Sequence, residues 1–217
     1  MRAHPFTIAL MALAVVGFAT DAAAQDSPAH AHMGHVADGF RGTPDGMGLL
    51  PAAIAEAEVA AMHAGLAARD LTDLDAMKRH TGHVQHAVDP TVVENGPGAG
   101  YGVKQGASGA ARHISMAADS EGATDNIRNH SNHVATSANN TVARADRILE
   151  LAAQIQEAES ADAAAPLVEE MAEVAGQLVS GLDANGDGRV GWQEGEGGLE
   201  QANAHMGFMK RGEGMGG

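Results

Sequence analysis

A twelve-residue segment near the carboxyl end of the chain carries oxygen donors at alternating positions. Asp183, Asn185 and Asp187 stand two residues apart, and Glu194 ends the segment Asp-Ala-Asn-Gly-Asp-Gly-Arg-Val-Gly-Trp-Gln-Glu. Carboxylate and amide oxygens are the donors that hard divalent cations prefer, and Ca²⁺ takes about six to eight of them. Gly188 permits the sharp turn that folds such a segment around one point. The spacing therefore predicts an oxygen-lined cation site.

The segment resembles the calcium loop of the EF-hand family, because it follows the pattern D-x-[DN]-x-[DN]-G-x5-E at every defined position. The resemblance covers residues 166–209 and implies an entering helix over 166–182 and an exit helix over 192–209. It also implies a Ca²⁺ ion bound by the side chains of four residues, the backbone carbonyl of a fifth and one water molecule at Gly191. These five protein ligands are Asp183, Asn185, Asp187, Arg189 and Glu194.

EF-hand loops usually work in pairs that meet at the eighth loop position, which is Val190 in this chain. The segments 70–80 and 119–129 lack the ligand spacing and the central glycine of a second loop. The resemblance therefore implies either a loop that stands alone or a homodimer that pairs two copies of it.

Histidine is the other abundant residue with metal-binding chemistry, since the chain has 12 histidines and no cysteine. The absence of cysteine excludes thiolate zinc sites, iron–sulfur clusters and covalently attached c-type haem. Any ion softer than Ca²⁺ must therefore be bound by imidazole, carboxylate or methionine.

Seven histidines fall within the predicted helical region, 51–160. On a helical wheel of about 100° per residue, one histidine on each of four predicted helices lies at the border of the apolar stripe. Two pairs also have the i, i+3 spacing that lets two imidazoles bind one metal ion from one helix. We therefore predict a Cu, Zn or Ni site built from His63, His80, His83, His113, His130 and His133, with solvated or hydrogen-bonded imidazoles as the alternative.

The remaining histidines carry weaker expectations. On the same wheel His83 lies well away from the apolar stripe, and His86 lies nearly opposite it. We expect His205 to stand alone, and a tract in the amino-terminal arm to capture Cu, Ni or Zn loosely. That tract consists of His30, His32 and His35.

Two other functions compete with metal binding alone. A b-type haem for electron transfer needs two axial histidines, or one histidine and a methionine such as Met62, Met77 or Met116, but few large apolar residues are present to enclose a porphyrin. A zinc hydrolase needs a general base, for which Glu56, seven residues before His63, is the one candidate. We expect a non-enzymatic protein.

The order of segments along the chain predicts an exported protein. Residues 1–24 begin with Arg2, continue through an apolar run over 6–18 and end in small residues, as secretory signals do. We expect a periplasmic or secreted protein without a membrane span after cleavage. The Gly-, Pro- and His-rich residues 25–50 predict a flexible arm.

Hydrophobic periodicity predicts helices throughout the rest of the chain. The first begins at Pro51 with Ala55, Val59, Met62 and Leu66 inward, and three more cover 72–88, 103–118 and 124–158. No stretch alternates with the period of a strand. The prediction is an all-α protein, with an antiparallel bundle of about four helices over 51–160 and a single EF-hand module with a Gly-rich tail over 161–217. The net charge of −15 argues against binding to nucleic acid.

Overall fold

The computed structural model describes residues 27–215, and the regular secondary-structure elements of this part of the chain are all helices, which confirms the all-α prediction. The predicted secretory signal at 1–24 lies outside these residues. The elements are α1 (Pro28–Ala37), the 3-10 turn η1 (Pro44–Gly46), α2 (Leu49–Ala67), α3 (Leu74–Val88), α4 (Val103–Asp119), α5 (Asp125–Glu157), α6 (Ala161–Ser180) and α7 (Leu199–Gly212).

Side-chain caps explain where several helices begin. An unpaired N–H in the first helical turn is satisfied when the residue before the helix offers a side-chain oxygen. Asp73 accepts a hydrogen bond from the backbone N–H of Ala76 at the start of α3, and Thr124 accepts one from Ile127 at the start of α5. The bounds predicted for α3, α4 and α5, which were 72–88, 103–118 and 124–158, lie within two residues of the observed ones.

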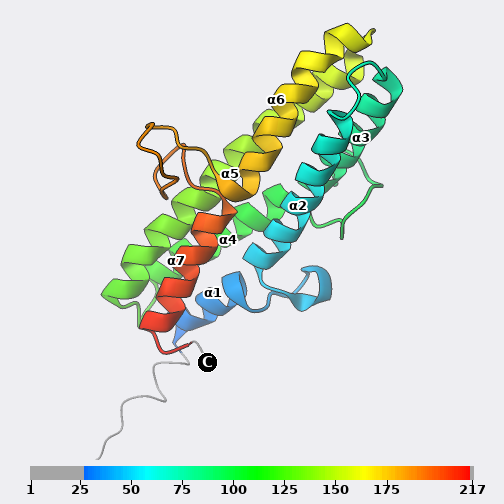
Figure 1. The fold of residues 1–217 in the computed structure, drawn as a ribbon. Coiled ribbons are helices and arrows are strands. Elements are labelled where there is room, and N and C mark those ends of the chain that lie inside the picture. Colours follow the sequence, from blue (N-terminus) through cyan, green and yellow to red (C-terminus); the bar gives the residue numbers. More distant parts are fainter. Residues whose placement is uncertain (1–26, 216–217) are drawn as a thin grey trace, which may run out of the picture.

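The long helix α5 organises the packing. Figure 1 shows it running the length of the molecule, and it packs against α3, α4, α6 and α7. Its buried face includes Ile127, Ile148, Leu151 and Ile155, which are fully inaccessible to solvent. The helices of the predicted carboxyl-terminal module, α6 and α7, share this apolar core with the amino-terminal helices. The described residues thus form seven α-helices around one core. The predicted division into a four-helix bundle and a separate EF-hand module is not confirmed.

The arm predicted over 25–50 contains a helix, so that prediction is wrong. Ala29, Met33 and Val36 recur at helical spacing and are fully buried in α1. The hydroxyl of Ser27 accepts a hydrogen bond from the backbone N–H of His30, and Pro28 suits the first helical position. This short apolar stripe is the local signal that the glycine and histidine content of the segment obscures.

The predicted inward face of the first bundle helix is also wrong. In α2 the buried face is made of small residues, among them Ala53, Ala57 and Ala60, whereas Met62 is 55% exposed. Because α2 is apolar on all sides, the larger side chains do not identify its core face. The small face permits a close approach to α4, where a Cβ added at Gly106 would lie 2.8 Å from the Cβ of Ala53.

Among the described residues, α2 is also the one helix whose length and composition would allow it to cross a membrane. The expectation of no membrane span after the signal stays a prediction, since a helix packed in a protein core, as α2 is, can have the same length and composition. Half of its apolar window is buried inside the protein, where α2 packs against α3, α4 and α6.

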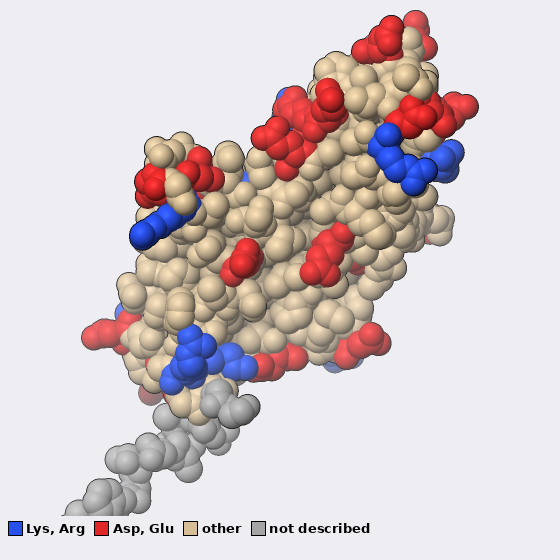
Figure 2. Space-filling view, viewed as in Figure 1, with Lys and Arg blue, Asp and Glu red and all other residues tan. Residues whose placement is uncertain are grey.

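Charge is distributed unevenly over the surface. Figure 2 shows acidic side chains gathered on the loop between α6 and α7 and at the end of the molecule where α5 meets α6. Basic side chains gather near the end of α7, whose last turn contains Lys210 and Arg211. Cations near a helix carboxyl terminus interact favourably with its dipole.

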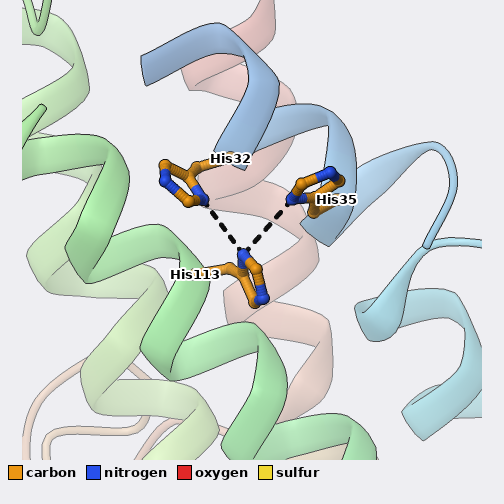
Figure 3. A group of neighbouring side chains, drawn as sticks. All are labelled: His32, His35 and His113. Carbon is orange, nitrogen blue, oxygen red and sulfur yellow. Dashed lines mark hydrogen bonds between the residues drawn. The ribbon is translucent and has the colours of Figure 1, made fainter. Parts of the chain in front are cut away.

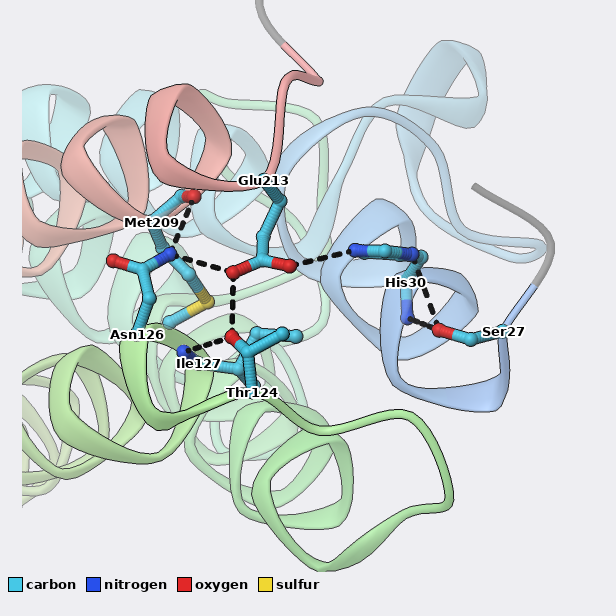
Figure 4. A network of polar contacts seen from close by, with 7 residues as sticks. All are labelled: Ser27, His30, Thr124, Asn126, Ile127, Met209 and Glu213. Atoms are coloured by element: carbon cyan, nitrogen blue, oxygen red, sulfur yellow. Dashed lines mark hydrogen bonds and ion pairs between the residues drawn. The ribbon is translucent and has the colours of Figure 1, made fainter. Parts of the chain in front are cut away.

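A polar cluster joins the ends of three helices around the carboxylate of Glu213 (Figure 4). Its Oε1 accepts hydrogen bonds from Thr124 Oγ1 at 2.6 Å and Asn126 Nδ2 at 2.8 Å, and its Oε2 lies 3.2 Å from His30 Nε2. Burial alone would raise the pKa of Glu213, but the hydrogen bonds from Thr124, Asn126 and His30 hold it below its ordinary value of 4.5. The cluster ties α1 to α5 and α7.

Replacing Glu213 by Ala should lower the free energy of unfolding by about 1–3 kcal/mol at pH 7, because the buried His30 and the partly buried Asn126 lose their acceptor. The folded state favours the ionised carboxylate, so its stabilisation is complete above pH 4.5 and is lost as the pH falls through the lowered pKa. Urea unfolding at pH 7 and at pH 3 measures both effects. Glu121→Ala, a change at an exposed loop glutamate, is the control, and an equal loss in both variants would contradict this role.

Candidate metal centres

Nine of the eleven histidines in the described part of the chain form three groups of three. Within each group the nitrogen atoms that could bind an ion all lie within 4.8 Å of one another. The first site consists of His32, His35 and His113, the second of His63, His80 and His83, and the third of His130, His133 and His205.

The first site joins α1 to α4. His32 and His35 are one helical turn apart on α1, and both point at His113 on α4 (Figure 3). The Nδ1 atom of His113 lies 3.0 Å from Nδ1 of His32 and 3.3 Å from Nδ1 of His35. Phe40 meets the rings of His35 and His113 edge-on, with centroids 5.4 Å and 5.0 Å away.

The second site joins α2 to α3 in the same way. His80 and His83 form the pair on α3, and the single histidine is His63 on α2. The Nδ1 atom of His63 lies 3.2 Å from Nδ1 of each partner. In the described chain, the aromatic contacts of these three rings are with one another.

The third site joins α5 to α7. His130 and His133 form the pair on α5, and the single histidine is His205 on α7. The Nδ1 atom of His205 lies 3.0 Å from Nδ1 of His130 and 3.2 Å from Nδ1 of His133. All three sites therefore present three Nδ1 atoms to one point between two helices.

The spacing of these nitrogens fits one metal ion per site. A tetrahedral ion with metal–nitrogen bonds of about 2.0–2.1 Å holds its ligand nitrogens roughly 3.3–3.4 Å apart. The measured separations of 3.0–3.3 Å are close to that value. The Nδ1 atom of a neutral imidazole carries either an N–H or a lone pair, so among three Nδ1 atoms facing one another at least two present the same group and repel each other. A bound cation would resolve that repulsion.

A sequence repeat underlies the three sites. Each helical pair lies in the pattern His-x-(Gly or Asn)-His-Val, over 32–36, 80–84 and 130–134. Each single histidine lies in the pattern Ala-x-x-His followed by apolar residues one and four positions later, over 60–67, 110–117 and 202–209. The valine and the three apolar positions are buried in every copy. This repeat is the signal that could have identified all nine histidines from the sequence.

The predicted histidines were expected to form one shared site, but the structure divides them among three groups. The predicted pairs His80/His83 and His130/His133 each enter one group, but His63 and His113 lie in different groups. His83, expected to lie away from the apolar stripe, lies in the second site because its Nδ1 faces the neighbouring helix. The pairs were recognisable from local spacing, whereas the third ligand comes from a helix distant in sequence.

Three expectations for other histidines are wrong. His205 was expected to stand alone, and it completes the third site. His32 and His35 were expected to lie in a flexible arm, and they form half of the first site on α1. His86, expected on the exposed side of its helix, is buried, and its Nδ1 lies 2.8 Å from the carbonyl oxygen of Val93.

The carboxylate proposed as a general base has another role. The Oε1 atom of Glu56 accepts a hydrogen bond from the backbone N–H of Tyr101 at 2.8 Å, just before α4 begins. A negative charge at a helix amino terminus is favourable. Glu56 and His63 are seven residues apart on α2, which corresponds to about 10 Å along a helix axis. Glu56 thus holds the backbone of the segment that leads into α4.

In the loop that resembles an EF-hand, the side-chain oxygens accept hydrogen bonds from the backbone N–H groups of the loop itself. Asp183 accepts hydrogen bonds from the N–H groups of Gly186, Asp187 and Gly188, and Asn185 accepts one from Asp187. Glu194 is exposed, and α7 begins at Leu199, whereas the resemblance implied an exit helix from 192. Five ligands around a Ca²⁺ ion therefore remain a prediction.

A buried glutamate beyond the motif closes the base of this loop. Glu196 is 3% exposed, and its Oε2 accepts a hydrogen bond from the N–H of Gly191 at 2.9 Å. Its backbone carbonyl accepts another from the N–H of Leu182 at 2.9 Å. The two ends of the loop are thus joined by the hydrogen bond between Leu182 and Glu196.

Burial and mutual repulsion lower the pKa of most histidines in the three sites. For His63, His113 and His205, burial is the main cause and the charge that neighbouring histidines would carry is the next. The effect is largest for His205, whose pKa falls to about 4. In the second site, Arg79 and Arg69 further lower the pKa of His80. At pH 7 these imidazoles are neutral, which is the form that binds metal ions.

Comparison of the chain with known protein families, curated proteins and solved structures finds no match. The functional argument therefore rests on the geometry of the sites.

The metal-free protein should lose stability as the pH falls from about 6.5 toward 4. Because the pKa of His205 is lowered from 6.5 to about 4, the unfolded chain binds a proton more tightly than the folded one over this range. One pKa unit corresponds to about 1.4 kcal/mol, so this histidine contributes up to ~3 kcal/mol. Thermal melts after removal of metal at pH 7, 5.5 and 4.5 measure the loss. His205→Asn should flatten the pH dependence, and an unchanged slope in this variant would contradict the assignment.

Proposed function

We propose that this chain is an exported metal-binding protein that holds three transition-metal ions, one at each histidine site. The observation that carries the proposal is the recurrence of one arrangement. Three separate helix pairs each direct three Nδ1 atoms at one point, with the same local sequence patterns. An isolated pair of facing histidines has many structural explanations, but three matched triads are best explained by three bound ions.

The donor set favours borderline ions. Neutral imidazole suits Zn, Cu and Ni, whereas Mg²⁺ and Ca²⁺ prefer oxygen. Each candidate site consists of imidazoles alone. Three protein ligands leave a tetrahedral ion one position for water or another small ligand. These features support reversible binding of Zn²⁺, Cu²⁺ or Ni²⁺.

Calcium binding by the loop 183–194 is the second part of the proposal. Asp183, Asn185 and Asp187 already turn their side-chain oxygens toward the loop backbone. To serve as the bidentate ligand, the exposed Glu194 must turn inward. Pairing of two such loops in a homodimer belongs to this same proposal.

Haem binding has less support. Axial ligands approach a haem iron from opposite faces of the porphyrin. The Nδ1 atoms in each triad are 3.0–3.3 Å apart, which leaves no space for a porphyrin between them. Hydrolysis at a His-bound metal also needs a general base, and the carboxylate nominated for it, Glu56, accepts a hydrogen bond from the backbone N–H of Tyr101.

The tag-free chain should bind three equivalents of Zn²⁺, measured by elemental analysis after dialysis. Replacing the single histidine of one site, in the variants His63→Ala, His113→Ala and His205→Ala, should remove one equivalent each, because two imidazoles hold an ion much more weakly than three. His86→Gln is the matched control and should retain three. A wild-type stoichiometry below three, or three ions retained in each of His63→Ala, His113→Ala and His205→Ala, would disprove the proposal.

Calcium at millimolar concentration should raise the melting temperature of the transition-metal-free protein, because it binds only the folded loop. The extracellular modules of the EF-hand family have dissociation constants of about 10⁻⁴–10⁻³ M. Glu194→Gln should remove most of the shift, whereas Glu200→Gln, at an exposed glutamate of α7, should leave it intact. Identical melts with and without calcium would refute calcium binding by this loop.

A further inference from the structure

The three histidine sites share their ligands but not their surroundings. Only in the third site, among the described residues, does an aromatic side chain from outside the triad stack face to face on a ligand. The indole of Trp192 lies on the imidazole of His133, with centroids 3.9 Å apart and planes inclined by 25°. The other face of this site is bordered by Phe208, whose ring lies 5.6 Å from that of His205. In the first site, Phe40 makes edge contacts only.

The loop that carries Trp192 is fixed to the same helix as His133. Asn140, two turns further along α5, donates from Nδ2 to the carbonyl of Gln193 and accepts at Oδ1 from the N–H of Gly195, at 2.8 Å and 2.9 Å. These two bonds hold the chain directly after Trp192. The backbone next to Trp192 is therefore fixed to the helix that carries His133.

A buried arginine strengthens the attachment. Arg144 is 8% exposed and donates to the carbonyl oxygens of Gly195, Glu196 and Gly197 at 2.6–2.9 Å. At Gly197 the backbone lies directly against α5, since an added Cβ would be 2.4 Å from the Oγ of Ser137. Helix α5 thus presents both the histidine and the anchors of the segment that covers it.

We propose that Trp192 is a positioning residue that clamps His133, so that a metal ion leaves the third site more slowly than the other two. This inference rests on the proposed metal-binding function. An ion held by three imidazoles is released when its ligands detach one after another, and each detaching ring must rotate away. The indole is stacked on the ring of His133, and the ring of His205 contacts His133 edge-on with centroids 4.5 Å apart, so rotation of His133 requires the indole to move. His35 and His83 are the equivalent ligands of the other two sites, and among the described residues no aromatic ring is stacked on either of them.

Release of Zn²⁺ to an excess of a chelating dye tests the clamp in the full-length protein. The wild-type chain should release two equivalents quickly and one slowly, and His205→Ala should remove the slow phase. Trp192→Ala should keep three equivalents but accelerate the slow phase by roughly 2- to 10-fold, the factor that corresponds to one aromatic pair. Trp192→Phe, which restores a stacked ring, should recover most of the slow phase.

Further variants separate a clamp from a general effect on stability. Asn140→Ala loosens the loop without touching a histidine and should accelerate the slow phase alone. Equal acceleration of all three equivalents by Trp192→Ala, or a slow phase that this variant leaves unchanged, would overturn the proposal. Three bound ions released in a single phase would also overturn it, while leaving the proposed function intact. Failure to bind three ions would instead defeat the proposed function itself.

The single tryptophan of the chain gives an independent readout. Paramagnetic Ni²⁺ in the third site would lie next to the indole and should quench its fluorescence. His205→Ala should abolish this quenching, whereas His63→Ala and His113→Ala should preserve it. Quenching that survives His205→Ala would show that Trp192 does not contact the third site in solution.

Discussion

The convergence of three imidazole nitrogens between two helices is the constraint on which the structure depends. A pair at i, i+3 can face one point only if a third histidine approaches from a neighbouring helix at a fixed height. The helices must therefore pack closely, and a small residue permits this at Gly212 of α7, where an added Cβ would meet the side chain of Asn126 on α5. The core of the protein is also rich in alanine. Small side chains bury little apolar area, so bound ions would add stability that this core lacks.

The first site shows how metal binding and folding are linked in such a design. Helix α1 has 10 residues, too few to be stable alone in water. Two attachments hold it from opposite sides. The cluster around Glu213 joins its amino end to α5 and α7, and His32 and His35 face His113 on α4. An ion bound there would join α1 to the bundle by three coordinate bonds, so loss of metal at this site would loosen the whole helix.

Local features of the sequence were sufficient to predict most of the helices. They were not sufficient to predict how the helices pack or which distant histidines meet. The helices that begin at Leu74 and Asp125 have apolar stripes and capping residues, and their bounds were predicted closely. Helix α2 is apolar on every side, so periodicity could not identify its buried alanine face. The histidine pairs were visible because they are local. Their third partners, such as His113 with His32, lie up to 81 residues away, and only the repeated sequence patterns connect them.

Identical ligands in unequal surroundings argue for sites with different properties. The positive charges of Arg79 and Arg69 act on His80 and oppose a cation at the second site. Within residues 27–215, no arginine acts in this way on the histidines of the third site, and the indole of Trp192 covers one of its ligands. Because the donor set is constant, differences in affinity and exchange must come from these neighbours. A chain with one exchangeable site and one retentive site can accept an ion at the exchangeable site and keep one at the retentive site. The surroundings, rather than the ligands, would then set the order in which the sites fill.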